Sequence, residues 1–206
     1  MRRAGILVAA LALMAPAAAH ARHTASFGST LSAAPTNVDP PATCTVQRAP
    51  QGAGEPSNSF SDTGPCALVA VGYSATGAVA GRVSAPFSGV IRRVRLRAGA
   101  PGLVRLQLVR LRGLDRDNGV AQAAAEPRGV TLHVAGRGAG RAESFRVNLP
   151  VHKGDYLAFA GGSFTALHCA GQAVDDLIYQ PLTPAFQDVG DNDSCTLLVQ
   201  ATISRR

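Results

Sequence analysis

The chain has 206 residues, of which 46% are hydrophobic and 5% aromatic, and it carries a formal charge of +7 at neutral pH. It contains no Trp and three Tyr, so it lacks the interleaved aromatic and basic residues with which nucleic-acid-binding grooves stack bases. We therefore interpret the basic charge as a surface property and expect no nucleic acid partner. The length fits one domain.

The first residues have the pattern of an export signal. A positively charged start precedes an apolar run from Ala4 to Ala18 and the small residues Ala19 and Ala21. We expect cleavage after residues 1–21 and a secreted mature chain with a charge of about +5, because two arginines leave with the signal. The apolar run is shorter than the roughly 20 residues that a spanning helix needs. We therefore expect no membrane span after cleavage.

The mature chain begins with a segment that is poor in apolar periodicity. Residues 22–41 are rich in Ser, Thr, Ala and Pro, which predicts an extended lead-in whose part Ser26–Gly28 can dock as an edge strand. The domain itself is expected over residues 42–206. Its first core strand is the apolar run Ala67–Gly72, which follows a loop of Pro, Gly and Ser from Arg48 to Pro65.

The most regular alternation lies between Val90 and Arg112. Apolar residues fall at every second position with Arg or Gln between them, which is the period of a strand with one solvent-facing side. Two such halves flank the turn sequence Ala98–Gly102 and predict a β-hairpin. Because a hairpin alone is marginally stable in water, a second sheet must cover its apolar side.

Further strands are expected at Val130–Val134, Ser144–Leu149, Tyr156–Ala160 and Cys195–Ile203, whereas the alanine-rich segment Val120–Glu126 fits a strand or a short helix. Short strands separated by turn residues, with no helix of convincing period, are typical of all-β proteins. We predict a single-domain antiparallel β-sandwich of jelly-roll type.

The cysteines predict covalent links. Cys44, Cys66, Cys169 and Cys195 are an even number in an exported chain, which favours two disulfides. Three connectivities are open, and we favour Cys44–Cys66 and Cys169–Cys195 because the cysteines form an early and a late pair. A four-cysteine zinc site is disfavoured because no Cys-x-x-Cys pair occurs.

The arginines of the predicted hairpin are the main candidates for a binding site. If Arg95, Arg97 and Arg105 share one face, they can pair with sulfated or carboxylated envelope polysaccharide. The commoner reason for such charges, which we favour from the sequence, is that they keep the sheet from pairing edge to edge. Sugar-binding sandwiches commonly stack rings on Trp or Tyr, which are scarce in this chain.

One loop has the composition of a calcium site. Asp188, Asp191 and Asp193 gather the oxygen ligands that Ca²⁺ prefers. Their order fits no calcium-loop motif, so the alternative is a solvated polar loop. Calcium is the one cofactor that we retain.

Two other function classes stay open. His133, His152 and His168 would allow a small extracellular hydrolase, but the chain has no Gly-x-Ser-x-Gly elbow, and we expect no catalytic residue. An inhibitor-like domain would instead contact a protein partner through the loop from Arg48 to Pro65.

Several short segments carry a resemblance. Ala25–Leu31, Phe87–Val94, Val104–Leu108 and Leu149–Asp155 resemble a group of uncharacterised secreted β-sandwich proteins of GC-rich bacteria. The resemblance implies a jelly-roll-like sandwich outside the cell and brings no known active site. We therefore expect a non-enzymatic binding or structural module of the cell envelope or extracellular space, whose ligand is not identified by the sequence and for which carbohydrate is one class.

Overall fold

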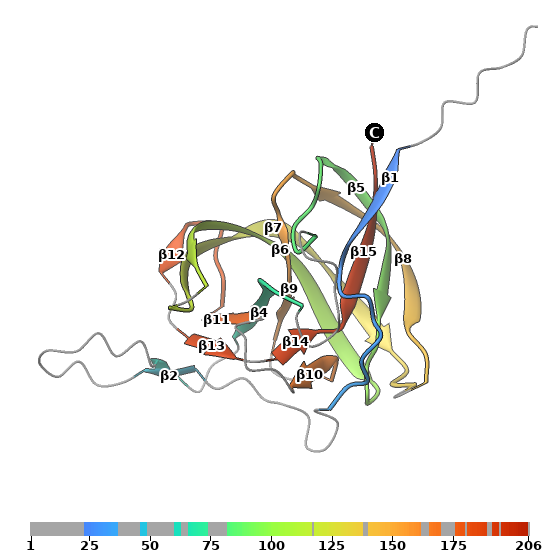
Figure 1. Ribbon diagram of the computed structural model, residues 1–206, viewed down its shortest axis with the longest axis horizontal. Helices are drawn as coiled ribbons and strands as arrows, with labels where there is room; N and C mark the ends of the chain where they lie inside the picture. Colours follow the sequence, from blue (N-terminus) through green and yellow to red (C-terminus); the bar gives the residue numbers. More distant parts are fainter. Residues whose placement is uncertain are drawn as a thin grey trace, which may run out of the picture.

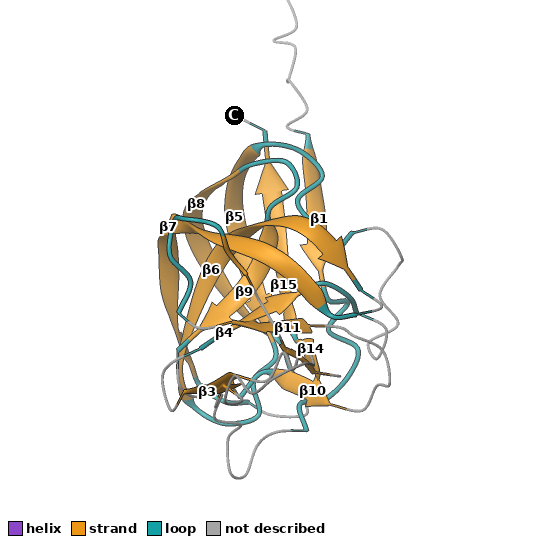
Figure 2. Ribbon diagram, turned by 90° about the vertical axis from the view of Figure 1, so that its left-hand side faces the viewer, coloured by secondary structure: helices purple, strands orange, loops and turns teal. Residues whose placement is uncertain are grey.

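The computed structural model describes residues 23–36, 46–48, 60–62, 66–73, 82–116, 118–137, 140–161, 165–169, 176–179, 181–188, 191–193 and 195–205. All regular structure in these residues is β-strand (Figure 2). Accordingly, the described part contains no helix that could cross a membrane. The predicted signal at residues 1–21 lies outside it.

The strands form two main antiparallel sheets and two short two-stranded pairs, β2–β3 and β10–β14. In chain order they are β1 (Thr24–Gly28), β2 (Val46–Arg48), β3 (Phe60–Asp62), β4 (Ala67–Ala70), β5 (Gly89–Leu96), β6 (Gly102–Asp115), β7 (Val120–Val134), β8 (Glu143–Val151), β9 (Tyr156–Ala160), β10 (Leu167–Cys169), β11 (Asp176–Tyr179), β12 (Gln187–Asp188), β13 (Asp191–Asp193), β14 (Cys195–Leu197) and β15 (Val199–Ser204). The predicted all-β antiparallel sandwich is confirmed.

The four-stranded sheet has the order β1-β15-β5-β8, on the right in Figure 1. On β5 the predicted alternation holds, because Val94 and Leu96 are buried while Arg93 and Arg95 are exposed. Against β15, Arg93 pairs with Thr202 and Ile91 pairs with Ile203, so Arg92 is an extra residue of β5. Such a bulge turns two consecutive side chains toward the same side, and this one leaves Arg92 exposed beside Arg93.

The seven-stranded sheet has the order β12-β7-β6-β9-β4-β11-β13 and curls strongly. Its two edge strands, β12 and β13, are separated along the chain only by residues 189 and 190. The three steps from Asp188 to Asp191 can span at most about 11 Å. The two edges of the sheet therefore approach each other, as Figure 1 shows for β12 and β13.

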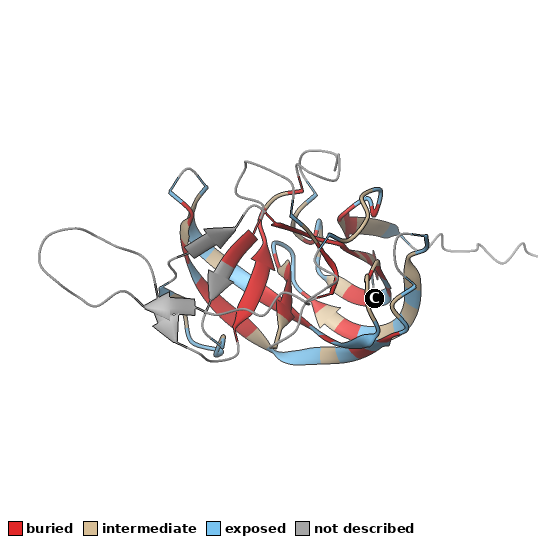
Figure 3. Ribbon diagram, turned by 90° about the horizontal axis from the view of Figure 1, so that it is seen from below, coloured by how far each residue is buried: buried red, intermediate tan, exposed pale blue. Residues whose placement is uncertain are grey.

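The main core lies between the two sheets. Phe27 and Leu96 from the four-stranded sheet belong to the same buried cluster as Leu106 and Phe159 from the seven-stranded sheet. In Figure 3 the strands are banded in buried and exposed segments, as alternation requires. A second cluster covers the opposite side of the seven-stranded sheet: Ala67, Val69, Val71, Val109, Ala121, Ala123, Ala158 and Leu177.

The predicted hairpin between Val90 and Arg112 is wrong. β5 pairs with β15 and β8, whereas β6 pairs with β7 and β9, so the turn Ala98–Gly102 carries the chain from one sheet to the other. Two strands with one apolar side each can bury those sides by facing each other across a core, and the same turn residues serve both arrangements. Val120–Glu126 is strand, continuous with Val130–Val134 in β7.

The structure confirms one predicted disulfide. Cys169 of β10 and Cys195 of β14 are register partners and are bonded to each other. Cys66 is also disulfide-bonded. Cys44, the partner that we predict for it, lies outside the described residues, as does most of the loop from Arg48 to Pro65.

Candidate functional site

The outer side of the four-stranded sheet carries four exposed arginines, which we call the arginine face: Arg92, Arg93, Arg95 and Arg146. The first three lie on β5 and the last on β8, where Arg146 is the register partner of Arg93. Register partners in an antiparallel pair project from the same side of the sheet. The four guanidinium groups therefore share one surface.

Only two of these arginines have polar partners among the described residues. Arg92 Nη1 donates to Asn148 Oδ1 at 2.6 Å, and Arg95 Nη1 lies 3.4 Å from Gln200 Oε1. Neither Arg93 nor Arg146 forms a hydrogen bond or an ion pair within the described part. The remaining polar side chains that point outward from these strands and are at least partly exposed are uncharged: Thr24, Ser26, Ser144, Asn148, Gln200 and Thr202.

The structure does not bring the three predicted binding arginines together. Arg95 lies on the arginine face. Arg97 follows the end of β5, and its Nη1 lies 3.1, 2.9 and 2.7 Å from the carbonyl oxygens of Leu31, Ser32 and Ala33. Arg105 is exposed on β6, whose neighbouring residues Val104 and Leu106 face the main core, so it projects from the opposite side of the sandwich.

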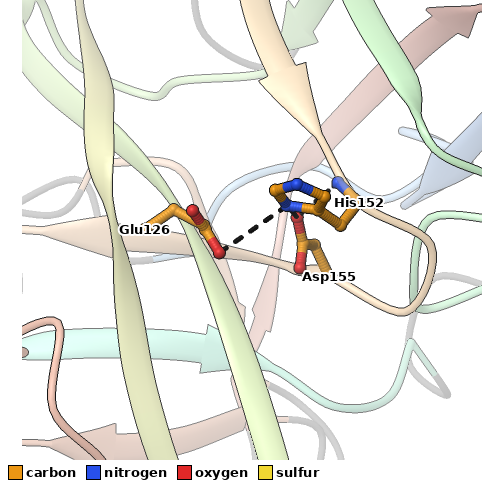
Figure 4. Close-up of side chains that lie close together, drawn as sticks. All are labelled: Glu126, His152 and Asp155. Atoms are coloured by element: carbon orange, nitrogen blue, oxygen red, sulfur yellow. Dashed lines mark hydrogen bonds and ion pairs between the residues drawn. The ribbon is translucent and has the colours of Figure 1, made fainter.

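A second group of polar side chains lies where the chain passes from β8 to β9. Glu126 of β7 lies with His152 and Asp155, which begin and end the turn between those two strands (Figure 4). One ligand-type atom from each residue lies within 4.8 Å of the other two. Arg110 of β6 forms an ion pair with Glu126.

A bulge in β7 places Glu126. The register of β6 and β7 runs from Gln107 opposite Gly129 to Val109 opposite Ala125, so three residues of β7 face one residue of β6. The middle one is Pro127, which cannot donate to a ladder and is tolerated at bulges. The bulge redirects the Glu126 side chain, which is only 14% exposed.

The turn places Asp155. Asp155 N donates to His152 O at 3.1 Å, and the Asp155 carboxylate accepts from His152 N at 2.7 Å through Oδ2. Gly154 supplies the positive φ of 89° that other residues rarely adopt. The turn also rests on the segment before β5, because Gly154 N donates to Ala85 O. The carboxylate is thereby held in one position.

Burial dominates the electrostatics of Asp155. Its side chain is 0% exposed, and Oδ1 is buried with no hydrogen-bond partner. Desolvation raises the pKa of Asp155, and the nearby Glu126 carboxylate raises it further, whereas the hydrogen bond from His152 N, the His152 ring and Arg110 oppose the rise. His152 Nδ1 lies 3.7 Å from Glu126 Oε1 and 3.7 Å from Asp155 Oδ2, too far for hydrogen bonds.

The three predicted histidines lie on different elements. His133 is exposed on β7. His168 of β10 bonds through Nδ1 to Ala34 O at 2.6 Å. Of the three, only His152 lies near a carboxylate of the described residues.

Of the predicted calcium ligands, Asp188 accepts a hydrogen bond from Gln122 Nε2 at 2.9 Å and lines a hollow of about 260 Å³ beside Arg112. The backbones of Asp191 and Asp193 pair with β11, and their side chains lie outside the described part. Calcium at this loop stays a prediction.

Comparison of the chain with models of known families, with curated proteins and with solved structures found no match in any of the three.

Proposed function

We propose that this protein is a secreted, non-enzymatic module that binds an acidic polysaccharide of the cell envelope or extracellular space on its arginine face. The observation that carries the proposal is an open sheet surface with four exposed guanidinium groups and no outward-pointing carboxylate among the described residues of its strands. Guanidinium groups bind carboxylates and sulfates with two parallel hydrogen bonds. A chain of repeating carboxylate or sulfate groups therefore fits this surface chemically.

The pairing of Arg93 with Arg146 supports a ligand of high charge density. Like charges directly opposite each other destabilise a sheet, and no described acidic side chain compensates this pair. An anionic polymer lying across β5 and β8 would neutralise both groups together. The face offers no aromatic ring from these four strands, so attraction between charges, and not stacking, would hold the polymer.

A disulfide bond supports the proposed location outside the cytosol. The Cys169–Cys195 disulfide is of the kind that persists in oxidising surroundings outside the cytosol. The export-signal pattern at residues 1–21 points the same way.

The proposal is tested by titrating the oxidised mature protein with heparin, polygalacturonate and uncharged dextran at two salt concentrations. We expect binding to the two acidic polymers that weakens with salt, and none to dextran. The double variant R93Q/R146Q should bind about tenfold more weakly, because each exposed charge pair contributes up to about 1 kcal/mol. The matched control is Arg105→Gln, which removes an exposed arginine from the other sheet.

Equal affinity of R93Q/R146Q and the parent protein, or equal loss in the Arg105→Gln control, would overturn the proposal. Double-stranded DNA is included as a competitor of another chemical class. Preference for DNA over both acidic polysaccharides would also overturn it.

A further inference from the structure

The geometry points to a divalent transition-metal site at Glu126, His152 and Asp155, which we propose binds Zn²⁺ with one or more positions open to solvent. The site is separate from the arginine face, because its residues come from β7 and the β8–β9 turn. It also differs from the predicted calcium loop at Asp188 to Asp193. The imidazole nitrogen makes the donor set suit Zn²⁺ better than Ca²⁺, which takes oxygen ligands.

The spacing of the donor atoms fits an ion shared between them. His152 Nδ1 lies 3.7 Å from an oxygen of each carboxylate. Metal–ligand bonds of about 2.1 Å at tetrahedral angles separate ligand atoms by about 3.4 Å. Shortening these two distances by a few tenths of an ångström, and bringing the two carboxylate oxygens, which lie within 4.8 Å of each other, to the same separation, converts the observed arrangement into a coordination site.

Asp155 gives an independent indication of a missing ligand. Its carboxylate is 0% exposed, and Oδ1 has no hydrogen-bond partner although water cannot reach it. Buried polar atoms are normally satisfied, and an ion held between Asp155, Glu126 and His152 would give this carboxylate a further partner. The fixed turn with Gly154 keeps this carboxylate in place before any ion arrives.

The side of the site toward solvent is the His152 side. The His152 side chain is 64% exposed and borders a hollow of about 210 Å³ lined also by Ser88, Gly89, Pro150 and Val151. Three protein ligands with an accessible fourth position are the pattern of an open zinc site, in contrast to closed structural sites with four protein ligands.

Arg110 competes with the metal. Its guanidinium pairs with Glu126 Oε1, but its side chain is 56% exposed and can turn into solvent. When a divalent ion takes the Glu126 carboxylate, this ion pair is lost. Removing Arg110 should therefore favour metal binding, an outcome that a merely structural salt-bridge network would not produce.

The test is calorimetric titration of the oxidised, chelator-treated protein with ZnCl₂, and separately with CaCl₂. We expect one Zn²⁺ per chain at this site, and we expect any heat from Ca²⁺ to be unchanged by His152→Gln. His152→Gln and Asp155→Asn should each weaken Zn²⁺ binding at least tenfold, whereas Arg110→Gln should tighten it. His133→Gln is the matched control, because it removes an exposed histidine elsewhere on β7.

Several results would overturn the site. They are Zn²⁺ binding that is unaffected by His152→Gln, binding that His133→Gln lowers equally, and weaker binding after Arg110→Gln. Because Asp155 is buried, circular dichroism checks that its variant folds. If Asp155→Asn does not fold, His152→Gln still tests the site, because the His152 side chain is exposed and its replacement should not disturb folding.

Discussion

Arg93 and Arg146 are register partners on adjacent antiparallel strands, and both side chains are exposed on the same side of the sheet. Like charges in this position destabilise a sheet by about 0.2–1 kcal/mol. We expect Arg146→Gln to raise the free energy of unfolding by an amount in this range while it weakens binding of acidic polysaccharide. Urea denaturation and polymer titration measure the two effects. A variant that loses stability would show that Arg146 has a structural partner instead.

Arg97 should stabilise the N-terminal segment. Its guanidinium holds the carbonyl groups of Leu31, Ser32 and Ala33. Because hydrogen bonds from a charged donor contribute about 1.5–3 kcal/mol each, we expect Arg97→Gln to lower the free energy of unfolding by about 2 kcal/mol. Hydrogen exchange of residues 29–36 should accelerate at the same time. Arg95→Gln, on the exposed face, should leave exchange there unchanged; equal acceleration in both variants would contradict this role.

Gly136 should not tolerate a side chain. Its φ is +63°, and an added Cβ would lie 2.1 Å from both Ala100 C and Pro101 N, in the segment that joins the two sheets. We expect Gly136→Ala to cost at least about 3 kcal/mol of stability, since strain at such a position adds to the steric clash. Gly113→Ala is the control: its φ is +59°, but nothing lies within 4 Å of the added atom. It should cost only about 1 kcal/mol. Thermal or urea unfolding compares them, and similar losses would refute the packing argument.

The pH dependence of stability should carry the signature of Asp155. Since burial raises its pKa, ionisation costs more in the folded than in the unfolded protein. The stabilisation that the folded protein gains from keeping Asp155 protonated is fully present below the unfolded pKa of 3.8. It is lost as the pH rises through the raised pKa of the folded protein. Asp155→Asn has no ionisable group at this position. The stability of the variant relative to the parent protein should therefore increase between pH 3.8 and the raised pKa, and then level off. Urea unfolding in EDTA measures this difference.

The control for the pH experiment is Asp188→Asn, because that carboxylate is exposed and hydrogen-bonded to Gln122. The same pH series on this variant separates the effect of burying a carboxylate from that of replacing an Asp by Asn. A parent protein that gains stability over Asp155→Asn as the pH rises would contradict the effect of burial.

Alternation allowed the strands to be predicted from the sequence, but not their neighbours. Val94, Leu96, Val104 and Leu106 are buried with exposed arginines between them, as expected. Whether a Gly- and Pro-containing turn reverses the chain within a sheet or carries it to the facing sheet depends on long-range packing. For this reason the hairpin prediction failed. For the same reason the sequence alone could not show that Arg95 and Arg105 lie on different sheets.

The candidate metal site could not be predicted from the sequence, because it also depends on long-range packing. Glu126 and Asp155 are far apart along the chain and meet because β7 and β9 flank β6 in the sheet. Two local signals were present in the sequence: Pro127 inside a strand pattern, which indicates a bulge, and an Asp three residues after His152 in a glycine turn. Neither signal identifies its partner.

The position of β15 determines when the four-stranded sheet can form. β15 is the last described strand, yet it lies between β1 and β5 and pairs with both. Thr24 pairs with Ser204, so nearly the whole described chain separates these partners in sequence. Contacts of such long range form late and slowly. During synthesis β1 must therefore wait for β15 before it can join the sheet, whereas the arginine face, which lies on the paired strands β5 and β8, can form before β15 is made.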